Sequence, residues 1–237
     1  MEKRPGLEIG RAKTPLDLLA GVDLVIFDFD GVVVDSEDMS LTTLRAALAE
    51  FGVPMSHEEV RQAFLGKSLA SIVAHLEAHG AAGHADVFVE RWQTTLFDAF
   101  RAELKPMAGL QAMLDTLAHR GVHHCIASSG SVARLDVALR AAGLRALFAH
   151  VFSAEHVQHG KPAPDLFLHA AGTLGVAPEA CLVIEDSPSG VRAAKTAGMR
   201  CIGFLGGGHL HAIRQQHGEH LIALGAERVA LAFADIV

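Results

Sequence analysis

Hydrophobic residues follow two different spacings along this chain. Short continuous apolar runs with β-branched and aromatic members predict buried strands, and Leu24–Phe29 is the first of them. Apolar residues three or four positions apart predict helices, and from Ser36 to Phe100 this is the only spacing present. After Gly109 the two patterns alternate as far as Leu205, so short strands are separated by helices.

The predicted elements fall into two groups. The first is a run of helices at Ser36–Phe51, Ser56–Phe64, Ser68–His79 and His84–Phe100. The second contains strands at Leu24–Phe29, His124–Ser128, Val151–Ser153, Cys181–Glu185 and Cys201–Leu205, and helices at Gly109–Arg120, Val132–Ala142, Asp165–Leu174 and Gly190–Ala197. Strands that alternate with helices favour a parallel sheet covered on both faces, so we predict a three-layer α/β fold.

These two groups also predict the domain organisation. Residues 22–35 and 105–237 form the core that contains the sheet, and residues 36–104 form an all-helical domain inserted after the first strand. Residues 1–21 are a polar N-terminal extension with a short helical turn at Leu16–Ala20. A chain of 237 residues, half of them hydrophobic, fits one core with one insertion.

Composition narrows the class of protein. The chain has 20 Lys and Arg against 27 Asp and Glu, and this net charge of −7 argues against binding to nucleic acid. Cys125, Cys181 and Cys201 lie in apolar runs without a Cys-x-x-Cys pair, which favours buried reduced thiols over a zinc site. No signal peptide and no apolar run of the roughly 18 residues that span a membrane is present. We therefore expect a cytoplasmic protein without a membrane partner; the oligomeric state cannot be read from the sequence.

Acidic residues mark the ends of two predicted strands. Asp28 and Asp30 end the first strand, followed by Gly31, which permits a sharp turn, while Glu185 and Asp186 end a later one. Ligands of open parallel sheets bind at the carboxyl ends of the strands, and side chains two apart on an extended segment share a side. We therefore expect these carboxylates to converge at one edge of the sheet.

A hydroxyl group and a lysine are predicted at the same edge. Ser128 ends the strand that begins at His124, Ser129 follows it, and Lys161 lies in a proline-stiffened loop before a helix. Clustered carboxylates repel one another, and a hard divalent cation such as Mg²⁺, which also bridges to phosphate, removes that penalty. The set of residues thus predicts a magnesium site that receives a phosphate group.

The residue types suit phosphoryl transfer. Asp28 would attack phosphorus and form an aspartyl-phosphate, and Asp30 would protonate the leaving group and then activate water. Mg²⁺ and Lys161 would offset charge on the phosphoryl oxygens, and Ser128 would hydrogen-bond one of them. Each residue alone has an ordinary explanation, because acids at strand ends often cap helices or turns and a lone lysine is usually solvated. Their joint occurrence at one edge favours catalysis.

The order of these residues resembles a known family. The segment DFDGVVVDSE, residues 28–37, resembles the first motif of the haloacid dehalogenase superfamily of phosphotransferases, and Ser128, Lys161 and the pair Glu185-Asp186 resemble its second, third and fourth motifs. The resemblance covers residues 22–210. It implies a Rossmann-like core with a helical cap at 36–104, as in β-phosphoglucomutase and in small sugar-phosphate or phosphoglycolate phosphatases.

The resemblance also implies roles for the acids and a class of substrate. The ligands of Mg²⁺ would be the Asp28 side chain, the Asp30 backbone carbonyl and the Asp186 side chain, and Glu185 would act on a metal-bound water. Ser128, Ser129 and Lys161 would bind the phosphate group of a small phosphorylated metabolite, with sugar and polyol phosphates favoured.

Two positions separate a hydrolase from a phosphosugar mutase. Family members that cleave carbon–halogen bonds lack the second acid of the first motif, so the presence of Asp30 favours an ester substrate. Mutases of the β-phosphoglucomutase type carry His at the position of Ser40 and Arg near Leu69, and both are missing here. We therefore expect a phosphatase, with the mutase as the alternative.

Other features of the sequence are given weaker interpretations. Gly66-Lys67-Ser68 is not a P-loop, because Arg61 stands where a glycine is required, but Lys67 is a candidate contact to the substrate from the cap. Gly206-Gly207-Gly208 is interpreted as a flexible loop. Four histidines near the end of the chain are interpreted as scattered surface residues: His209, His211, His217 and His220. Four apolar residues with a spacing of four are interpreted as the buried stripe of a helix: Phe88, Trp92, Leu96 and Phe100.

Overall fold

The computed structural model describes residues 17–65, 69–81 and 83–237, and its centre is a parallel sheet. The strands are β1 (Leu24–Phe27), β2 (His123–Ser128), β3 (Val151–Ser153), β4 (Cys181–Glu185), β5 (Arg200–Phe204) and β6 (Arg228–Ala230). They lie in the order β3-β2-β1-β4-β5-β6, and each neighbouring pair is parallel. The predicted α/β fold is confirmed.

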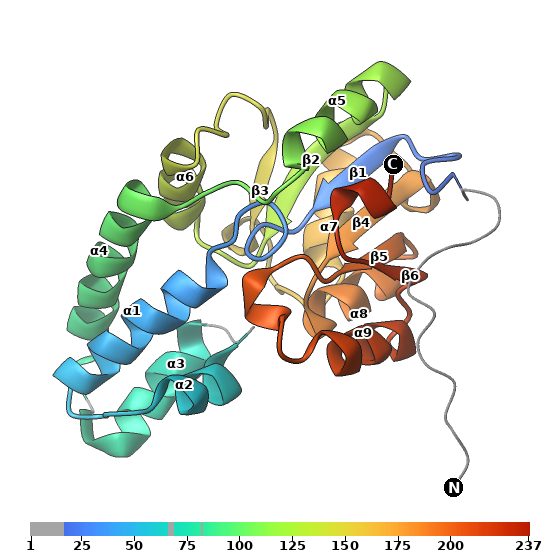
Figure 1. Ribbon diagram of the computed structural model, residues 1–237. Coiled ribbons are helices and arrows are strands. Elements are labelled where there is room, and N and C mark those ends of the chain that lie inside the picture. The colour runs from blue at the N-terminus through green and yellow to red at the C-terminus, as the bar shows by residue number, and fades with distance from the viewer. Residues whose placement is uncertain (1–16, 66–68, 82) are drawn as a thin grey trace, which may run out of the picture.

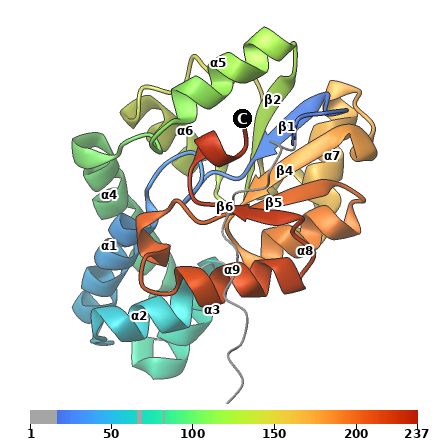
Figure 2. The same ribbon diagram turned by 45° about the vertical axis from the view of Figure 1, so that its right-hand side comes forward.

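Helices cover both faces of the sheet (Figures 1 and 2). One face carries α5 (Leu110–Arg120) and α6 (Val132–Ala141), and the other carries α7 (Asp165–Leu174), α8 (Pro188–Thr196) and α9 (Arg214–Ala223). Alternate residues of β1 serve the two faces, because Val25 and Phe27 join one hydrophobic cluster while Leu24 and Ile26 join the other. This alternation produces the three layers.

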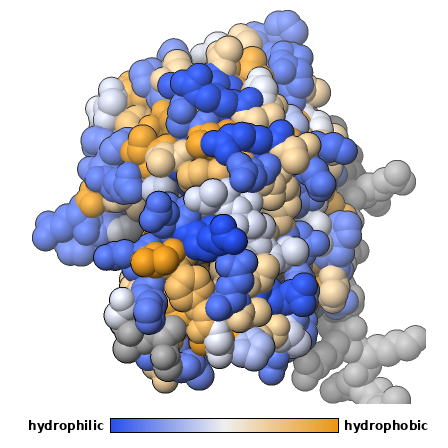
Figure 3. All heavy atoms as spheres, turned by 90° about the vertical axis from the view of Figure 1, so that its left-hand side faces the viewer, coloured by the Kyte–Doolittle hydropathy of each residue, from blue (hydrophilic) through white to orange (hydrophobic). Residues whose placement is uncertain are grey.

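The segment of residues 36–103, between β1 and α5, is helical and lies beside the carboxyl edge of the sheet in Figure 1. It contains α1 (Glu37–Glu50), α2 (His57–Phe64), α3 (Leu69–Leu76), a π-helical turn (Glu77–Ala81) and α4 (Ala85–Glu103), and is named here the helical insertion. As predicted, the stripe Phe88, Trp92, Leu96 and Phe100 is buried. Figure 3 shows the face of the molecule that lies on the left-hand side of Figure 1, and on it small groups of hydrophobic residues alternate with hydrophilic ones.

Several boundaries differ from the sequence prediction. Strand β1 ends at Phe27 and not at Phe29, because the Phe29 carbonyl accepts the Val33 N–H at 2.8 Å in a turn. The helix predicted to reach His79 ends at Leu76 and continues as the π-helical turn. Helix α9 and strand β6 were not predicted. Among the described residues, no helix is both long and apolar enough to cross a membrane. Residues 1–16 and Lys67 lie outside the described residues.

Candidate active site

Asp28 is held in place at the carboxyl end of β1. Its backbone N–H donates to the Ile184 carbonyl at 2.9 Å, which extends the pairing of β1 with β4 by one residue. The chain then turns at Gly31, whose φ of 79° is the left-handed conformation that glycine adopts without strain. A Cβ atom at this position would also overlap the carboxylate of Asp186. Gly31 therefore permits both the turn and the close approach of the two strand ends.

Glu185 and Asp186 occupy the corresponding position at the carboxyl end of β4, of which Glu185 is the last residue. The Glu185 side chain is fully buried, and its Oε1 accepts from the backbone N–H and the hydroxyl of Ser187 at 3.0 and 2.8 Å. The Ser187 hydroxyl in turn accepts the Gly190 N–H at 3.1 Å and caps α8. The start of a helix thus fixes one oxygen of Glu185 and leaves the other for Lys161.

Lys161 joins the two strand ends. Its Nζ lies 2.5 Å from Oδ1 of Asp28 and 2.7 Å from Oε2 of Glu185, and it stands 4.8 Å from the centre of the Phe167 ring. Burial alone would lower the pKa of Lys161, but the two carboxylates outweigh it and raise that pKa above its ordinary value. The lysine is therefore charged across the physiological pH range.

The acids at these two strand ends can hold a metal ion. Asp28, Glu185 and Asp186 each offer a carboxylate oxygen, and these oxygens lie within 4.8 Å of one another. Burial, followed by the charge of Glu185, raises the pKa of Asp28 and of Asp186 well above the ordinary value. Three buried carboxylates facing one lysine leave excess negative charge, so the residues present fit a hard divalent cation with oxygen ligands.

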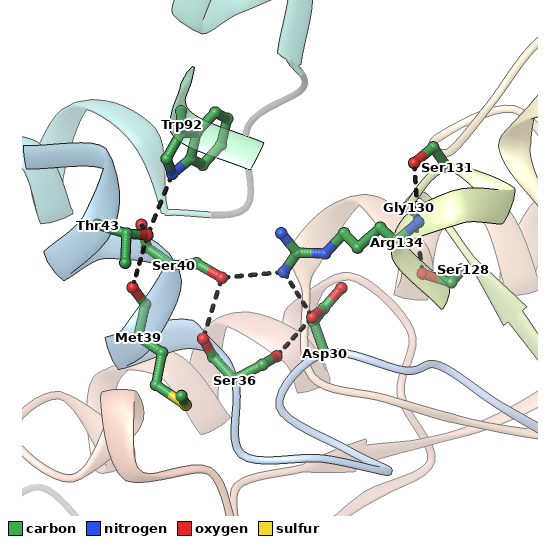
Figure 4. A network of polar contacts seen from close by, with 10 residues as sticks. All are labelled: Asp30, Ser36, Met39, Ser40, Thr43, Trp92, Ser128, Gly130, Ser131 and Arg134. Carbon is green, nitrogen blue, oxygen red and sulfur yellow. Dashed lines mark hydrogen bonds and ion pairs between the residues drawn. The ribbon is translucent and has the colours of Figure 1, made fainter. Parts of the chain in front are cut away.

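The Asp30 carboxylate does not belong to this group of three. Its Oδ1 accepts from the Ser36 hydroxyl at 2.5 Å and from Nη2 of Arg134 at 2.7 Å, and the same nitrogen lies 2.9 Å from the Ser40 hydroxyl (Figure 4). The sequence predicts that the carboxylates converge at one edge of the sheet. The charge of Asp30 contributes to the raised pKa of Asp186, while Ser36 and Arg134 bind the Asp30 carboxylate. Its Oδ2 makes no hydrogen bond within the described part of the chain, as Figure 4 illustrates.

Arg134 is a site residue that the sequence prediction missed. It lies in the first turn of α6, whose cap is the Ser131 hydroxyl, and its guanidinium stands 5.2 Å from the centre of the Phe100 ring in α4. Its side chain is 17% exposed. It therefore contacts both the sheet-containing part and the helical insertion.

The serines predicted to bind phosphate differ in exposure. Ser128, at the end of β2, is buried, and its hydroxyl accepts the Gly130 N–H at 3.0 Å. Ser129 is exposed. The role of both residues, like that of Lys67, stays a prediction.

Two of the four C-terminal histidines are not scattered on the surface. The His209 side chain is only 3% exposed, and its Nε2 lies 3.2 Å from Oδ2 of Asp186. Nε2 of His217 lies 2.6 Å from the Asp186 carbonyl oxygen. The surface interpretation is wrong for this pair, because the loop after β5 and helix α9 fold back over the end of β4. Burial lowers the pKa of both histidines.

Glu37 also lies in this environment. Burial, with the charges of Asp30 and Asp186, raises the pKa of Glu37 from 4.5 to about 7. The sequence included Glu37 in the first motif but gave it no role.

The comparisons with known proteins agree with this geometry. A family model described as haloacid dehalogenase-like hydrolase matches residues 25–204. Hexitol phosphatase A of Escherichia coli is 33% identical over 180 residues, which are 75% of this chain and 80% of that protein. The crystal structure of a HAD family hydrolase from Deinococcus radiodurans, with bound phosphate and sodium, is 33% identical with a TM-score of 0.73; the match covers 92% of this chain and 94% of that one.

One relative is much longer than this chain. The chloroplastic protein SUPPRESSOR OF QUENCHING 1 of Arabidopsis thaliana is 35% identical over 191 residues, which are 76% of this chain but only 18% of that protein. The similarity therefore concerns one part of it.

Proposed function

The chain belongs to the haloacid dehalogenase-like hydrolase family, and from this membership and the geometry of its acids we propose that it is a magnesium-dependent phosphatase of a small phosphorylated metabolite. The observation that carries the proposal is the close group of Asp28, Glu185 and Asp186, joined by Lys161. Such a group offers a nucleophile, a cation site and a fixed positive charge within one edge of the sheet.

The first half of the reaction transfers the phosphoryl group to Asp28. A carboxylate oxygen of Asp28 forms a bond to phosphorus while the bond from phosphorus to the ester oxygen breaks, and Asp30 gives its proton to that oxygen. The charge of Lys161 favours the ionised form of Asp28, orients its carboxylate and offsets charge on the phosphoryl oxygens. Mg²⁺, held by Asp28 and Asp186 with Glu185 beside it, would supply further neutralisation of that charge.

The second half restores the enzyme. Water forms a bond to phosphorus, the bond from phosphorus to Asp28 breaks, and Asp30 takes the proton of the water. Inorganic phosphate leaves and both aspartates return to their starting state.

The helical insertion would act as the cap of this site. It supplies Ser36 and Ser40 to the contacts around Asp30, and Phe100 to the Arg134 side chain. Excluding water while the phosphoryl group is transferred and selecting the leaving group are the roles that such a cover serves.

Sugar and polyol phosphates are the favoured substrates, a proposal supported by the similarity to hexitol phosphatase A. Hydrolysis is favoured over a phosphosugar mutase because Ser40, whose hydroxyl contacts Arg134, stands where those mutases carry His. β-Glucose 1-phosphate with a trace of bisphosphate tests the alternative: a phosphatase releases phosphate, and a mutase forms glucose 6-phosphate.

The experiment that tests the proposal is a phosphate-release screen over sugar, polyol and acid phosphates, with Mg²⁺ or with EDTA. We expect release in Mg²⁺ only, and none from Asp28→Asn. The control is Asp38→Asn, a side chain that is 74% exposed. Unchanged turnover of the Asp28→Asn variant would contradict the nucleophile assignment.

A further inference from the structure

His209 lies against the carboxylate of Asp186, one of the proposed metal ligands. The distance from its Nε2 to Oδ2 of Asp186 is 3.2 Å, within the range of a hydrogen bond from a ring N–H. The opposite ring nitrogen, Nδ1, is buried and has no hydrogen-bond partner among the described residues. From this placement, and resting on the proposed metal-dependent function, we infer that His209 is a positioning residue: its Nε2–H holds Asp186 in the orientation that binds the cation.

Glycines make the room for this ring. A Cβ atom at Gly31 would lie 2.8 Å from Cε1 of His209, and a Cβ atom at Gly207 would lie 2.6 Å from the same atom. Both distances are shorter than the contacts that Cβ atoms make in proteins. Any other residue at either position would push the imidazole away from Asp186. The run Gly206-Gly207-Gly208 therefore has a packing role, which its interpretation as a flexible loop did not include.

The buried Nδ1 atom indicates which tautomer is present. A neutral imidazole has one N–H and one lone pair. With the proton on Nδ1, a buried N–H would lack an acceptor and the Nε2 lone pair would face a carboxylate. With the proton on Nε2, the N–H faces the carboxylate and only a lone pair stays unpaired, which is the smaller cost. The Nε2–H tautomer is therefore the one that fits.

A neutral donor suits a ligand of a cation. An arginine or lysine at this place would also orient Asp186, but its charge would oppose the metal ion. A neutral N–H fixes one oxygen and leaves the carboxylate its full charge. His217 helps to position the backbone of Asp186, because its Nε2 lies 2.6 Å from the Asp186 carbonyl oxygen.

The test compares two amides at position 209. The side-chain nitrogen of Gln reaches about as far as Nε2 of His, whereas that of Asn reaches only as far as Nδ1. The whole 237-residue chain, freed of metal, is titrated with Mn²⁺, and free Mn²⁺ is measured by its EPR signal. We expect His209→Asn and His209→Ala to bind Mn²⁺ about 10- to 100-fold more weakly than the unchanged protein, and His209→Gln to keep most of the affinity.

The control is His211→Ala, an exposed histidine two residues along, which should bind Mn²⁺ as the unchanged protein does. If His209→Ala fails to fold by circular dichroism, the Gln and Asn variants still decide the matter. Equal affinity in the Gln and Asn variants would overturn the inference, as would a spectrum showing a histidine nitrogen bound directly to Mn²⁺. Failure of the unchanged protein to bind Mn²⁺ would instead count against the proposed metal-dependent function.

Discussion

Nη2 of Arg134 lies 2.7 Å from Oδ1 of Asp30, although 104 positions separate the two residues in the sequence. The same nitrogen contacts Ser40 in α1, so one guanidinium joins α6, the loop after β1 and the helical insertion. Asp30 is the proposed general acid and base. Its carboxylate is therefore placed by a residue that carries no motif of its own.

Loss of this contact should slow the reaction more than it weakens substrate binding. In Arg134→Gln, Asp30 loses its charged partner, and small displacements of a catalytic group are costly, so we expect kcat to fall about 10- to 100-fold. Steady-state kinetics on the best substrate of the screen measure it. Arg140→Gln, at an exposed position on the same helix, serves as the control. An effect on KM alone would show that Arg134 contacts the substrate and does not position Asp30.

The sequence predicted those parts of the site that are local in the chain. Asp28 directly follows β1, Glu185 is the last residue of β4 and Asp186 follows it, so the strand pattern alone brings them to one edge. Arg134 is different, because an arginine in the first turn of an amphipathic helix has no local sign of its long-range partner. His209 could have been noticed from the glycines before it, which were given no packing role.

The C-terminal elements were missed for a physical reason as well. Helix α9, RQQHGEHLIA, buries only Gly218 and Leu221 and has almost no apolar periodicity. Strand β6 has three residues and is recognisable only through its pairing with β5. Tertiary contacts, and not local pattern, determine both.

Removal of the Asp30 carboxyl should affect substrates according to their leaving group. In Asp30→Asn, alkyl phosphates lose the proton that their alkoxide needs, so turnover should fall by about 10²- to 10⁴-fold. p-Nitrophenolate leaves without a proton, so Asp28 should still be phosphorylated while hydrolysis of the aspartyl-phosphate is slow. Rapid-mixing measurements should show a burst of one p-nitrophenol per enzyme. Equal losses for both substrates without a burst would exclude Asp30 as the proton donor.

Two glycines offer a matched test of the packing around Glu185. A Cβ atom at Gly190 would overlap the buried Glu185 carboxyl group, whereas one at Gly172 in α7 meets nothing within 4 Å. We expect Gly190→Ala to lower the free energy of unfolding by about 1–3 kcal/mol. Gly172→Ala should raise the free energy of unfolding by about 0.4–1 kcal/mol, because alanine lowers the conformational entropy of the unfolded chain. Urea unfolding measures both, and two variants of equal stability would contradict the close packing of α8 on Glu185.

The stability of the metal-free protein should fall as the pH rises, and Mg²⁺ should reverse the fall. Burial raises the pKa of Asp28 and Asp186 well above the ordinary value, and that of Glu37 from 4.5 to about 7. Between the unfolded and the folded pKa, the folded state binds more protons than the unfolded state, so the free energy of unfolding decreases with pH. For Glu37 this window runs from 4.5 to about 7.

The metal ion competes with those protons, so it should bind best where the carboxyl groups are ionised. We expect Tm in EDTA to be lower at pH 8 than at pH 5.5, and saturating Mg²⁺ to raise Tm much more at pH 8. A concentration of 100 times the dissociation constant adds about 2.7 kcal/mol to the free energy of unfolding. Thermal unfolding at both pH values, with Ca²⁺ and Na⁺ in parallel, measures the effect. A Tm in EDTA that rises over this range would mean that groups with a lowered pKa in the folded state, such as His209 and His217, outweigh the buried carboxyl groups. A Tm increase with Mg²⁺ that is no larger at pH 8 than at pH 5.5 would contradict the competition between the cation and the protons.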